Sequence, residues 1–464
     1  MTVPPKIIAP LDPDFIPASL WNRAFQAAVT ATGAGQKLAI ALERPDGSIS
    51  AYHTTVFPHH GDHIALNERY VERLVKFLLW QKGGYKIVIA GDPAIATHIR
   101  TVYSPAGARA FDYDFMGDRV YGRAMVIEST TYDNAPAENE AGSPLGRHLE
   151  GCRIGFDLGG SDRKCAAVID GEVVFSEEIG WDPYFQTDPQ FHYDGIDDSL
   201  KRAAAHLPRV DAIGGSAAGV YVNNEIRVAS LFRGVPRDQF DQRVRRMFFE
   251  LQKAWGGIPF VVVNDGEVTA LAGSMALGDG AVLGVSMGTS QAGGYVNPEG
   301  SITGWLNELA FVPVDYRANA PMDEWSKDGG VGAQYFSQQA VNRLLPAARI
   351  DLPATMPLAE KLIAVQELMA AGDRRAADIY RTIGTYLGYA LAQYADMYQL
   401  RHALILGRVL SGEGGDILLA AARKVLKDEF PEIAEKVGIH VPGEKEKRHG
   451  QAVAAASLPA LVKL

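Results

Sequence analysis

Apolar and polar positions before residue 150 predict a small α/β layer. Residues 37–57 indicate two strands joined by a turn at Pro45-Asp46-Gly47. Residues 67–80 indicate an amphipathic helix, and residues 86–92 indicate a further strand. The apolar positions with helical spacing are Tyr70, Val71, Leu74, Val75, Leu78 and Leu79.

The pattern repeats on a larger scale after residue 150. Residues 153–160, 164–170 and 172–179 predict three short strands with tight turns, and buried strands are expected to end near residues 219 and 265. Two successive α/β halves favour two lobes. The expected organisation is an additional N-terminal α/β domain at 1–130, a linker at 131–150, a first lobe at 151–280 and a second lobe at 281–464, with the terminal helix returning to the first lobe.

Composition narrows the function classes. The 464 residues contain 45 Lys and Arg against 55 Asp and Glu, a net charge of −10, which argues against a nucleic-acid surface. Cys152 and Cys165 are the two cysteines and form no CxxC pair, so neither a disulfide framework nor a cysteine-based metal site is expected. No segment has the apolar length of a transmembrane helix, and the expected location is the cytoplasm, without membrane association.

The first candidate site is the turn after the strand that ends near Asp157. Gly159, Gly160 and Ser161 follow, and glycines permit unusual backbone conformations and a close approach of amides to a phosphate. A carboxylate at a strand end can hold Mg²⁺ directly or through water. Alone, the motif is equally compatible with a hairpin turn.

The second candidate is Asn264-Asp265, at the end of the apolar run 258–263. In open α/β sheets the carboxyl ends of the strands face the ligand. Asp265 can accept a proton from a substrate hydroxyl there, and Asn264 can orient the substrate. The alternative is a helix N-cap, the commoner role of such a pair.

Two later glycine turns complete the set. Hydroxyl and amide groups at Gly288, Thr289 and Ser290 can grip phosphate oxygens, or the segment can be a plain β-turn. Gly407 and Gly412 can lay backbone against an adenosine. The alternative for this last stretch is a helix entry capped by Ser411.

The order of these parts resembles that of the actin-like ATPase superfamily, which includes sugar kinases, hexokinase and actin. Residues 151–464 most resemble the ROK family of sugar kinases and related repressors, on the stretches DLGGS, GIPFVVVNDGEVTALAG and GVSMGTSQAGGYVNPEGSITGWLNELAFVPVD. The resemblance implies an α/β, two-lobed actin-like ATPase (RNase H-like) fold with an additional N-terminal α/β domain.

The resemblance also implies a function, which is ATP-dependent phosphorylation of a sugar or sugar-like hydroxyl. Asp265 corresponds to the general base, and Asn264 and Glu308 to sugar ligands. Mg²⁺ near Asp157 and the glycine turns would neutralise phosphate charge. The implied partners are ATP and a small sugar. The oligomeric state stays open, with a homodimer as one candidate.

The sequence departs from the family at three places. Phe311 stands where ROK kinases have a histidine that binds both sugar and zinc. Residues 320–330 replace the cysteine-rich zinc motif, so no structural zinc is expected. Ser290 replaces the second glycine of Gly-Thr-Gly.

Three alternatives remain at this stage. A non-catalytic sugar sensor on the same fold is the main functional alternative. Residues 1–150 lack the basic helix-turn-helix of ROK repressors, and a truncated copy of the same fold is one interpretation of that region. His53, His59, His60, Asp62 and His63 are a conceivable metal site, although an exposed loop is favoured.

Overall fold

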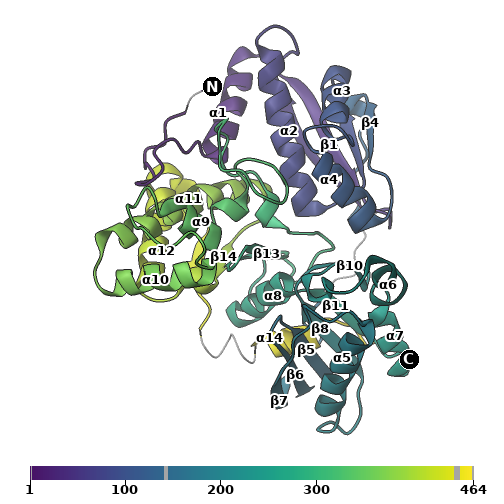
Figure 1. The fold of residues 1–464 in the computed structure, drawn as a ribbon. Helices are drawn as coiled ribbons and strands as arrows, with labels where there is room; N and C mark the ends of the chain where they lie inside the picture. The colour runs from purple at the N-terminus through teal and green to yellow at the C-terminus, as the bar shows by residue number, and fades with distance from the viewer. Residues whose placement is uncertain (2, 141–144, 444–449, 462–464) are drawn as a thin grey trace. The chain divides into compact units, whose positions relative to one another are not determined.

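The computed structural model describes residues 1, 3–140, 145–443 and 450–461. The chain forms two compact units (Figure 1). Unit 1 contains residues 1–142, 285–293 and 305–440, and unit 2 contains residues 143–284, 294–304 and 441–464. Residues 141–144 of the expected linker lie outside the described residues.

The N-terminal part of unit 1 is built on a four-stranded sheet in the order β2-β1-β3-β4. The strands are β1 (Gln36–Glu43), β2 (Ile49–Val56), β3 (Lys86–Ala90) and β4 (Val126–Thr130). The predicted hairpin is confirmed, because Arg44 donates a backbone hydrogen bond to Ser48 across a turn in which Gly47 has φ +85°. β1 pairs antiparallel with both β2 and β3, and β3 pairs parallel with β4.

This sheet does not repeat the sheet of unit 2. There the first strand of the motif, β5 (Cys152–Leu158), pairs parallel with the strand that follows the crossover helix, β8 (Ala212–Ala217). The equivalent pair β1 and β3 is antiparallel. The interpretation of residues 1–150 as a truncated copy of the same fold is therefore wrong.

Helix α2 (His63–Lys82) confirms the predicted amphipathic helix but is buried on more than one face. The predicted apolar positions are all buried, and so are Glu72, Arg73, Lys76 and Trp80. The charged face pairs with other buried charges instead of facing water. The other helices of this part are α1 (Ala18–Thr32), α3 (Pro93–Val102), α4 (Ala110–Asp114) and a π-helical turn at Phe115–Tyr121.

The charges on α2 belong to a buried ion cluster that connects α2, α4 and the loop at residues 323–328. Lys76 Nζ lies 2.5 Å from Asp112, and Arg73 lies 3.1 Å from Asp328. Asp328 also lies 2.8 Å from the guanidinium of Arg109. The cluster balances three cations against three anions: Arg73, Lys76, Arg109, Glu72, Asp112 and Asp328.

An aromatic cluster lies beside the buried ion cluster. The Trp80 ring lies 4.2 Å from that of Phe311, and Phe311 lies 5.7 Å from Phe111 and 6.0 Å from Trp325. Trp80 Nε1 donates to Asp112 at 2.5 Å, which joins the two clusters. Residues 320–330 thus pack against the N-terminal part through charged and aromatic side chains.

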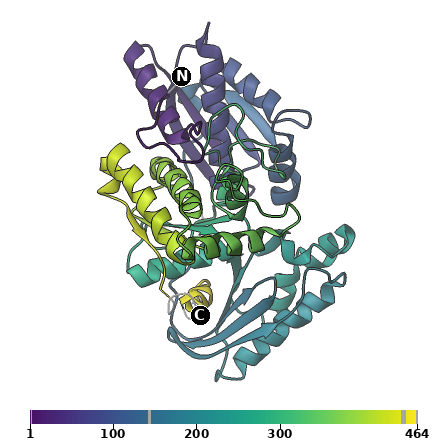
Figure 2. The same cartoon turned by 60° about the vertical axis from the view of Figure 1, so that its left-hand side comes forward.

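The rest of unit 1 is mainly helical. Its long helices α11 (Arg374–Met397) and α12 (Glu413–Glu429) lie side by side (Figure 2), where a Cβ on Gly384 would lie 2.1 Å from the Leu418 carbonyl oxygen. The shorter helices are α9 (Gln338–Leu344), α10 (Leu358–Ala370) and α13 (Pro431–Ala434). A sheet in the order β13-β12-β14-β15 comprises β12 (Val282–Met287), β13 (Gln291–Val296), β14 (His402–Leu406) and β15 (Gly438–His440).

Unit 2 is built on a five-stranded sheet in the order β11-β8-β5-β6-β7 (Figure 1). Strand β5, β6 (Asp162–Ile169) and β7 (Glu172–Gly180) are the three predicted strands and form an antiparallel meander. Strands β5, β8 and β11 (Phe260–Asn264) are parallel. The other elements are β9 (Val220–Val222), β10 (Glu225–Val228), α5 (Pro189–Ala204), α6 (Arg237–Gln239), α7 (Met247–Ala254), α8 (Asp265–Leu277) and α14 (Gln451–Ala456).

Glycines let α14 approach the unit 2 sheet closely. A Cβ on Gly155 would lie 2.2 Å from the Ala452 carbonyl oxygen, and one on Gly214 would lie 1.8 Å from that of Ala455. Arg153 donates to the Ala456 and Pro459 carbonyl oxygens beyond them. Among the described helices, none combines the length and the apolar character needed to cross a membrane.

The buried ion cluster leads to a stability prediction. Asp328→Asn removes one anion and leaves three buried cations with two partners, so the free energy of unfolding should fall by about 3–5 kcal/mol. Denaturant unfolding followed by circular dichroism measures the change. The matched control is Asp428→Asn, which removes an exposed ion pair with Lys424 on the α12 surface and should have a much smaller effect, because water screens that pair. Similar small losses in both variants would contradict the predicted role of the cluster.

Candidate functional site

Three parallel strands of unit 2 end side by side and carry the strongest candidates. The register pairs Asp157 of β5 with Ser216 of β8, and Ala217 of β8 with Asn264 of β11. The chain leaves all three strands at the same edge, which is where ligands bind in open α/β sheets. This edge, defined by Asp157, Ser216, Asn264 and Asp265, is called the carboxyl edge below.

Asn264 caps helix α8, so the N-cap alternative is confirmed for this residue. Its Oδ1 accepts from the Gly266 amide at 2.7 Å, and its Nδ2 donates to the Gly219 carbonyl oxygen at 2.7 Å. Asp265 is the first residue of α8, and its Oδ1 accepts from the Gly266 amide at 3.0 Å. The cap therefore fixes the backbone from which the Asp265 carboxylate projects.

Burial, and after it the nearby negative charge of Asp157, together raise the pKa of Asp265 to about 6. Burial also raises the pKa of Asp157, against hydrogen bonding from Ser216 and the positive charge of Lys164. Among the described residues, no cation pairs directly with Asp265. Asp265 thus has the pKa expected of a general base that works near neutral pH.

The turn with Gly159, Gly160 and Ser161 is a tight hairpin between β5 and β6. The Gly159 amide donates to the Asp162 carbonyl oxygen at 2.9 Å, and Trp181 Nε1 donates to the Gly159 carbonyl oxygen at 2.8 Å. Neither glycine has a positive φ, so the expectation that they supply unusual backbone conformations is wrong. Gly160 provides space instead, because a Cβ there would lie 2.0 Å from Tyr184 Oη.

Sequence reasoning missed several residues at the carboxyl edge. The Ser216 side chain forms a hydrogen bond with Asp157. The partly buried Tyr221 lies near both carboxylates, and its pKa is raised by burial and then by Asp265 and Asp157. Ser216 is the second-last residue of β8, as Asp157 is of β5, so the strand-end rule applies to it equally. Lys164 of β6 forms an ion pair with Asp162 at 3.2 Å.

The remaining phosphate and adenosine candidates lie in unit 1. Gly288, Thr289 and Ser290 form the turn between β12 and β13, with the Gly288 amide donating to the Ser290 carbonyl oxygen at 3.0 Å. Gly407 follows β14 with φ +109°, and a Cβ there would lie within 2.4 Å of the Met287 carbonyl oxygen. The two turns are therefore neighbours.

Gly412 begins α12 from a residue with φ +77° and is the N-cap. The alternative that Ser411 caps this helix is wrong, because no side chain caps α12. The Gln366 side chain donates to the Arg408 carbonyl oxygen at 2.9 Å and steadies the loop before Gly412.

Glu308 follows Asn307, which has a φ of +50°, in the segment 305–311 of unit 1. The amides of Asn307 and Glu308 donate to the Gln81 and Trp80 carbonyl oxygens at 3.0 Å each. The structure thus gathers six candidates in unit 2, namely Asp157, Gly159, Gly160, Ser161, Asn264 and Asp265. It places the other six in unit 1, namely Gly288, Thr289, Ser290, Glu308, Gly407 and Gly412.

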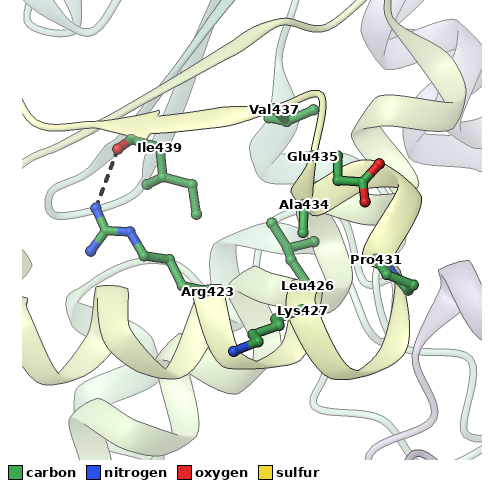
Figure 3. A pocket seen from close by; sticks show the side chains of 8 residues that line it. All are labelled: Arg423, Leu426, Lys427, Pro431, Ala434, Glu435, Val437 and Ile439. Atoms are coloured by element: carbon green, nitrogen blue, oxygen red, sulfur yellow. Dashed lines mark hydrogen bonds between the residues drawn. The ribbon is translucent and has the colours of Figure 1, made fainter.

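The histidines near residue 60 and a groove along α12, α13 and β15 do not form a further candidate site. Across the described residues, no group of three or more His, Cys, Asp or Glu side chains could hold a metal, and this includes the histidines near residue 60. A groove of about 630 Å³ lies along α12, α13 and β15, and none of the residues that line it is a candidate (Figure 3). Its Arg423 donates to the Ile439 carbonyl oxygen at 3.2 Å.

Comparison with solved structures identifies the fold. The structure is similar to the ROK hexokinase of Thermus thermophilus, with a TM-score of 0.52 and 20% identity over 66% of this chain and 97% of that chain. It is also similar to a ROK family transcriptional regulator, a homolog of the E. coli MLC protein, with a TM-score of 0.51 and 17% identity over 84% of this chain and 96% of that chain. No protein-family model and no curated protein matches the sequence.

The predicted fold class is confirmed. The protein has the actin-like ATPase fold found in ROK sugar kinases, with additional α/β structure at its N-terminus.

The packing of Gly160 leads to a double-mutant prediction. Gly160→Ala places a methyl group against Tyr184 and should lower the free energy of unfolding by about 1–3 kcal/mol. In a Tyr184→Ala background the same substitution should cost at least 1 kcal/mol less, because the obstructing ring is gone. Urea unfolding of the four proteins measures this coupling, and equal costs in both backgrounds would contradict the proposed contact.

The raised pKa of Asp265 leads to a pH prediction. Its ionisation disfavours the folded chain, because the unfolded carboxyl ionises near pH 4 and the folded one near pH 6. The free energy of unfolding of Asp265→Asn, relative to that of the parent protein, should therefore increase by about 2 kcal/mol between pH 4.5 and pH 7.5. The exposed control Asp238→Asn should show no such growth in urea unfolding at the two pH values. A pH-independent difference for Asp265→Asn would show that its pKa is not raised.

Proposed function

We propose that the protein transfers the γ-phosphoryl group of ATP to a hydroxyl of a sugar or sugar-like acceptor. The observation that carries this proposal is the position of Asp265 at the carboxyl edge, with a pKa of about 6, in a protein with the fold of a ROK hexokinase. A carboxylate with this pKa is mostly ionised at pH 7 and can accept a proton.

On the acceptor side, Asp265 receives the hydroxyl proton while the acceptor oxygen bonds to the γ-phosphorus and the bond from that phosphorus to the β-phosphate oxygen breaks. The products are a phosphorylated acceptor and ADP. Asn264 and Glu308 bind acceptor hydroxyls in this scheme. The amide of Asn264 is held at both ends, at 2.7 Å each, so it presents a fixed surface to the acceptor.

On the donor side, the turns at Gly159–Ser161 and Gly288–Ser290 hold phosphate oxygens, and Gly407 and Gly412 lie against the adenosine. Asp157 and Ser216 present oxygen atoms only, which is the donor set that Mg²⁺ prefers. After burial, the negative charge of Asp157 is the second cause that raises the pKa of Asp265, so a divalent cation at this edge would offset the repulsion between the two carboxylates. A bound Mg²⁺ would supply neutralisation of phosphate charge.

A non-catalytic sugar sensor is the second candidate function. Its support is the similarity to a ROK transcriptional regulator over 84% of the chain, together with Phe311 and Ser290 in place of the kinase residues. The described N-terminal region is a four-stranded sheet with helices instead of a helix-turn-helix.

Turnover measurements test the kinase proposal. Sugar-dependent ADP release from ATP and Mg²⁺ should be detectable with at least one member of a panel of hexoses and amino sugars. Asp265→Asn should lower kcat by about 10²–10⁴-fold, because it removes the proton acceptor while keeping the side-chain shape. The kcat/KM of the parent enzyme should fall below a pH near 6, where Asp265 becomes protonated.

The control is Asp162→Asn, on the same face but outside the proposed proton path. It should keep kcat within about tenfold of the parent protein. Absence of turnover with every sugar, combined with sugar binding that Asp265→Asn leaves unchanged, would contradict the kinase proposal and support the sensor.

A further inference from the structure

The last turn of α2 provides the hydrogen-bond acceptors for the segment that contains Glu308. The last four carbonyl groups of a helix have no hydrogen-bond donor within the helix and need donors from elsewhere. Here the Trp80 carbonyl oxygen accepts from the Glu308 amide and the Gln81 carbonyl oxygen from the Asn307 amide, both at 3.0 Å. The helix end and the segment 305–311 therefore satisfy each other.

Side chains on both sides reinforce this junction. The fully buried Gln81 donates through Nε2 to the Met397 carbonyl oxygen at 2.8 Å, and Tyr398 Oη donates to Asn307 Oδ1 at 2.9 Å. Lys82 Nζ lies 2.9 Å from the centre of the Trp305 ring. Trp80, Gln81 and Lys82 thus each contact the segment 305–311 or the residues at 397–398 next to it.

The backbone of the segment needs this support. Asn307 has φ +50°, a left-handed conformation that is uncommon outside glycine and persists when surrounding contacts determine it. Asn307 is also 1% exposed, so its polar groups have no access to bulk water. The two carbonyl groups of α2 and the hydroxyl of Tyr398 are among the contacts that hold this conformation.

The orientation of α2 is in turn fixed one and two turns earlier. The Trp80 ring packs on Phe311 at 4.2 Å, while Lys76 and Arg73 are held by the buried ion cluster. A rotation of α2 would move the carbonyl groups of Trp80 and Gln81 and separate Lys76 from Asp112. The position of Glu308 therefore depends on residues that lie more than 200 positions earlier in the chain.

We propose that the last turn of α2, residues 80–82, positions Glu308 and thereby sets the affinity for the acceptor. In this proposal the N-terminal α/β structure supports the acceptor site. It does so next to residues 320–330, which the ROK resemblance aligns with the zinc motif of that family. This inference rests on the proposed role of Glu308 in acceptor binding. Trp80 is a positioning residue in this scheme, because it acts through the backbone of Glu308.

The test compares Trp80→Phe with a matched control in the full-length protein. Trp80→Phe removes the Nε1 hydrogen bond to Asp112 and weakens the contact with Phe311. The control Phe25→Leu removes a buried ring that stacks on Tyr70 at 4.2 Å, within the same N-terminal structure but away from the segment 305–311. Both variants lose buried packing, but only the first should disturb Glu308.

Two readouts are measured for each variant. Hydrogen exchange of the Asn307 and Glu308 amides should accelerate by about tenfold or more in Trp80→Phe and stay unchanged in Phe25→Leu. The acceptor KM should rise about tenfold in Trp80→Phe with the ATP KM changed less than twofold, whereas Phe25→Leu should leave both constants unchanged. Gln81→Met, which removes the bond to the Met397 carbonyl oxygen, should show the same pattern if Trp80→Phe fails to fold.

Glu308→Gln separates this inference from the proposed function. It should weaken acceptor binding while the two amides remain protected, because it changes the ligand group and keeps the backbone. Unchanged amide exchange in both Trp80→Phe and Gln81→Met would overturn the positioning role of α2. Accelerated exchange combined with unchanged acceptor binding in Glu308→Gln would instead show that α2 positions the segment but that Glu308 does not bind the acceptor.

Discussion

The pairing of charges inside unit 1 is the constraint on which the rest of the structure depends. Lys76 is 0% exposed and Asp112 is 1% exposed, so neither ion has water to replace a lost partner. Removing charges from water is costly, and only close, balanced partners offset that cost. The register of α2 against residues 323–328 is therefore strongly determined. That register also determines the positions of Trp80, of Phe311, on which Trp80 packs, and of the segment with Glu308.

At the carboxyl edge, the cost of burying a carboxylate is not offset by a paired cation among the described residues. Asp328 has three cations within reach, whereas Asp265 has backbone amides and the neighbouring Asp157. Burial without a cation leaves the Asp265 carboxylate a stronger base than an ordinary one. A paired carboxylate contributes to structure, and an unpaired one at a strand end is available for chemistry.

Much of the fold and part of the site could be predicted from local patterns. The strands β5, β6 and β7, the hairpin of β1 and β2 and the apolar face of α2 follow from periodicity. Asn264 and Asp265 lie at a strand end because their apolar run ends there. The assignment of roles to these residues stays a prediction, because it rests on the order of the motifs.

The missed features depend on contacts between distant parts of the chain. The charged face of α2 resembles a solvated face, and its burial depends on partners elsewhere in the chain, among them Asp328, 255 positions after Arg73. The role of Gly160 depends on Tyr184, and Ser411 is not a cap because the backbone of Gly412 already begins the helix. The strand directions of the N-terminal sheet likewise depend on pairing, which periodicity does not specify.

This separation along the chain has a consequence for synthesis on the ribosome. At about 5–20 residues per second, Asp328 is made roughly 13–50 s after Arg73. During that interval the nascent N-terminal sheet can form, but Arg73 and Arg109 lack their later partner and the end of α2 lacks the amides of Asn307 and Glu308. The nascent segment therefore exposes unpaired charges and unpaired carbonyl groups until about two thirds of the polypeptide has been made.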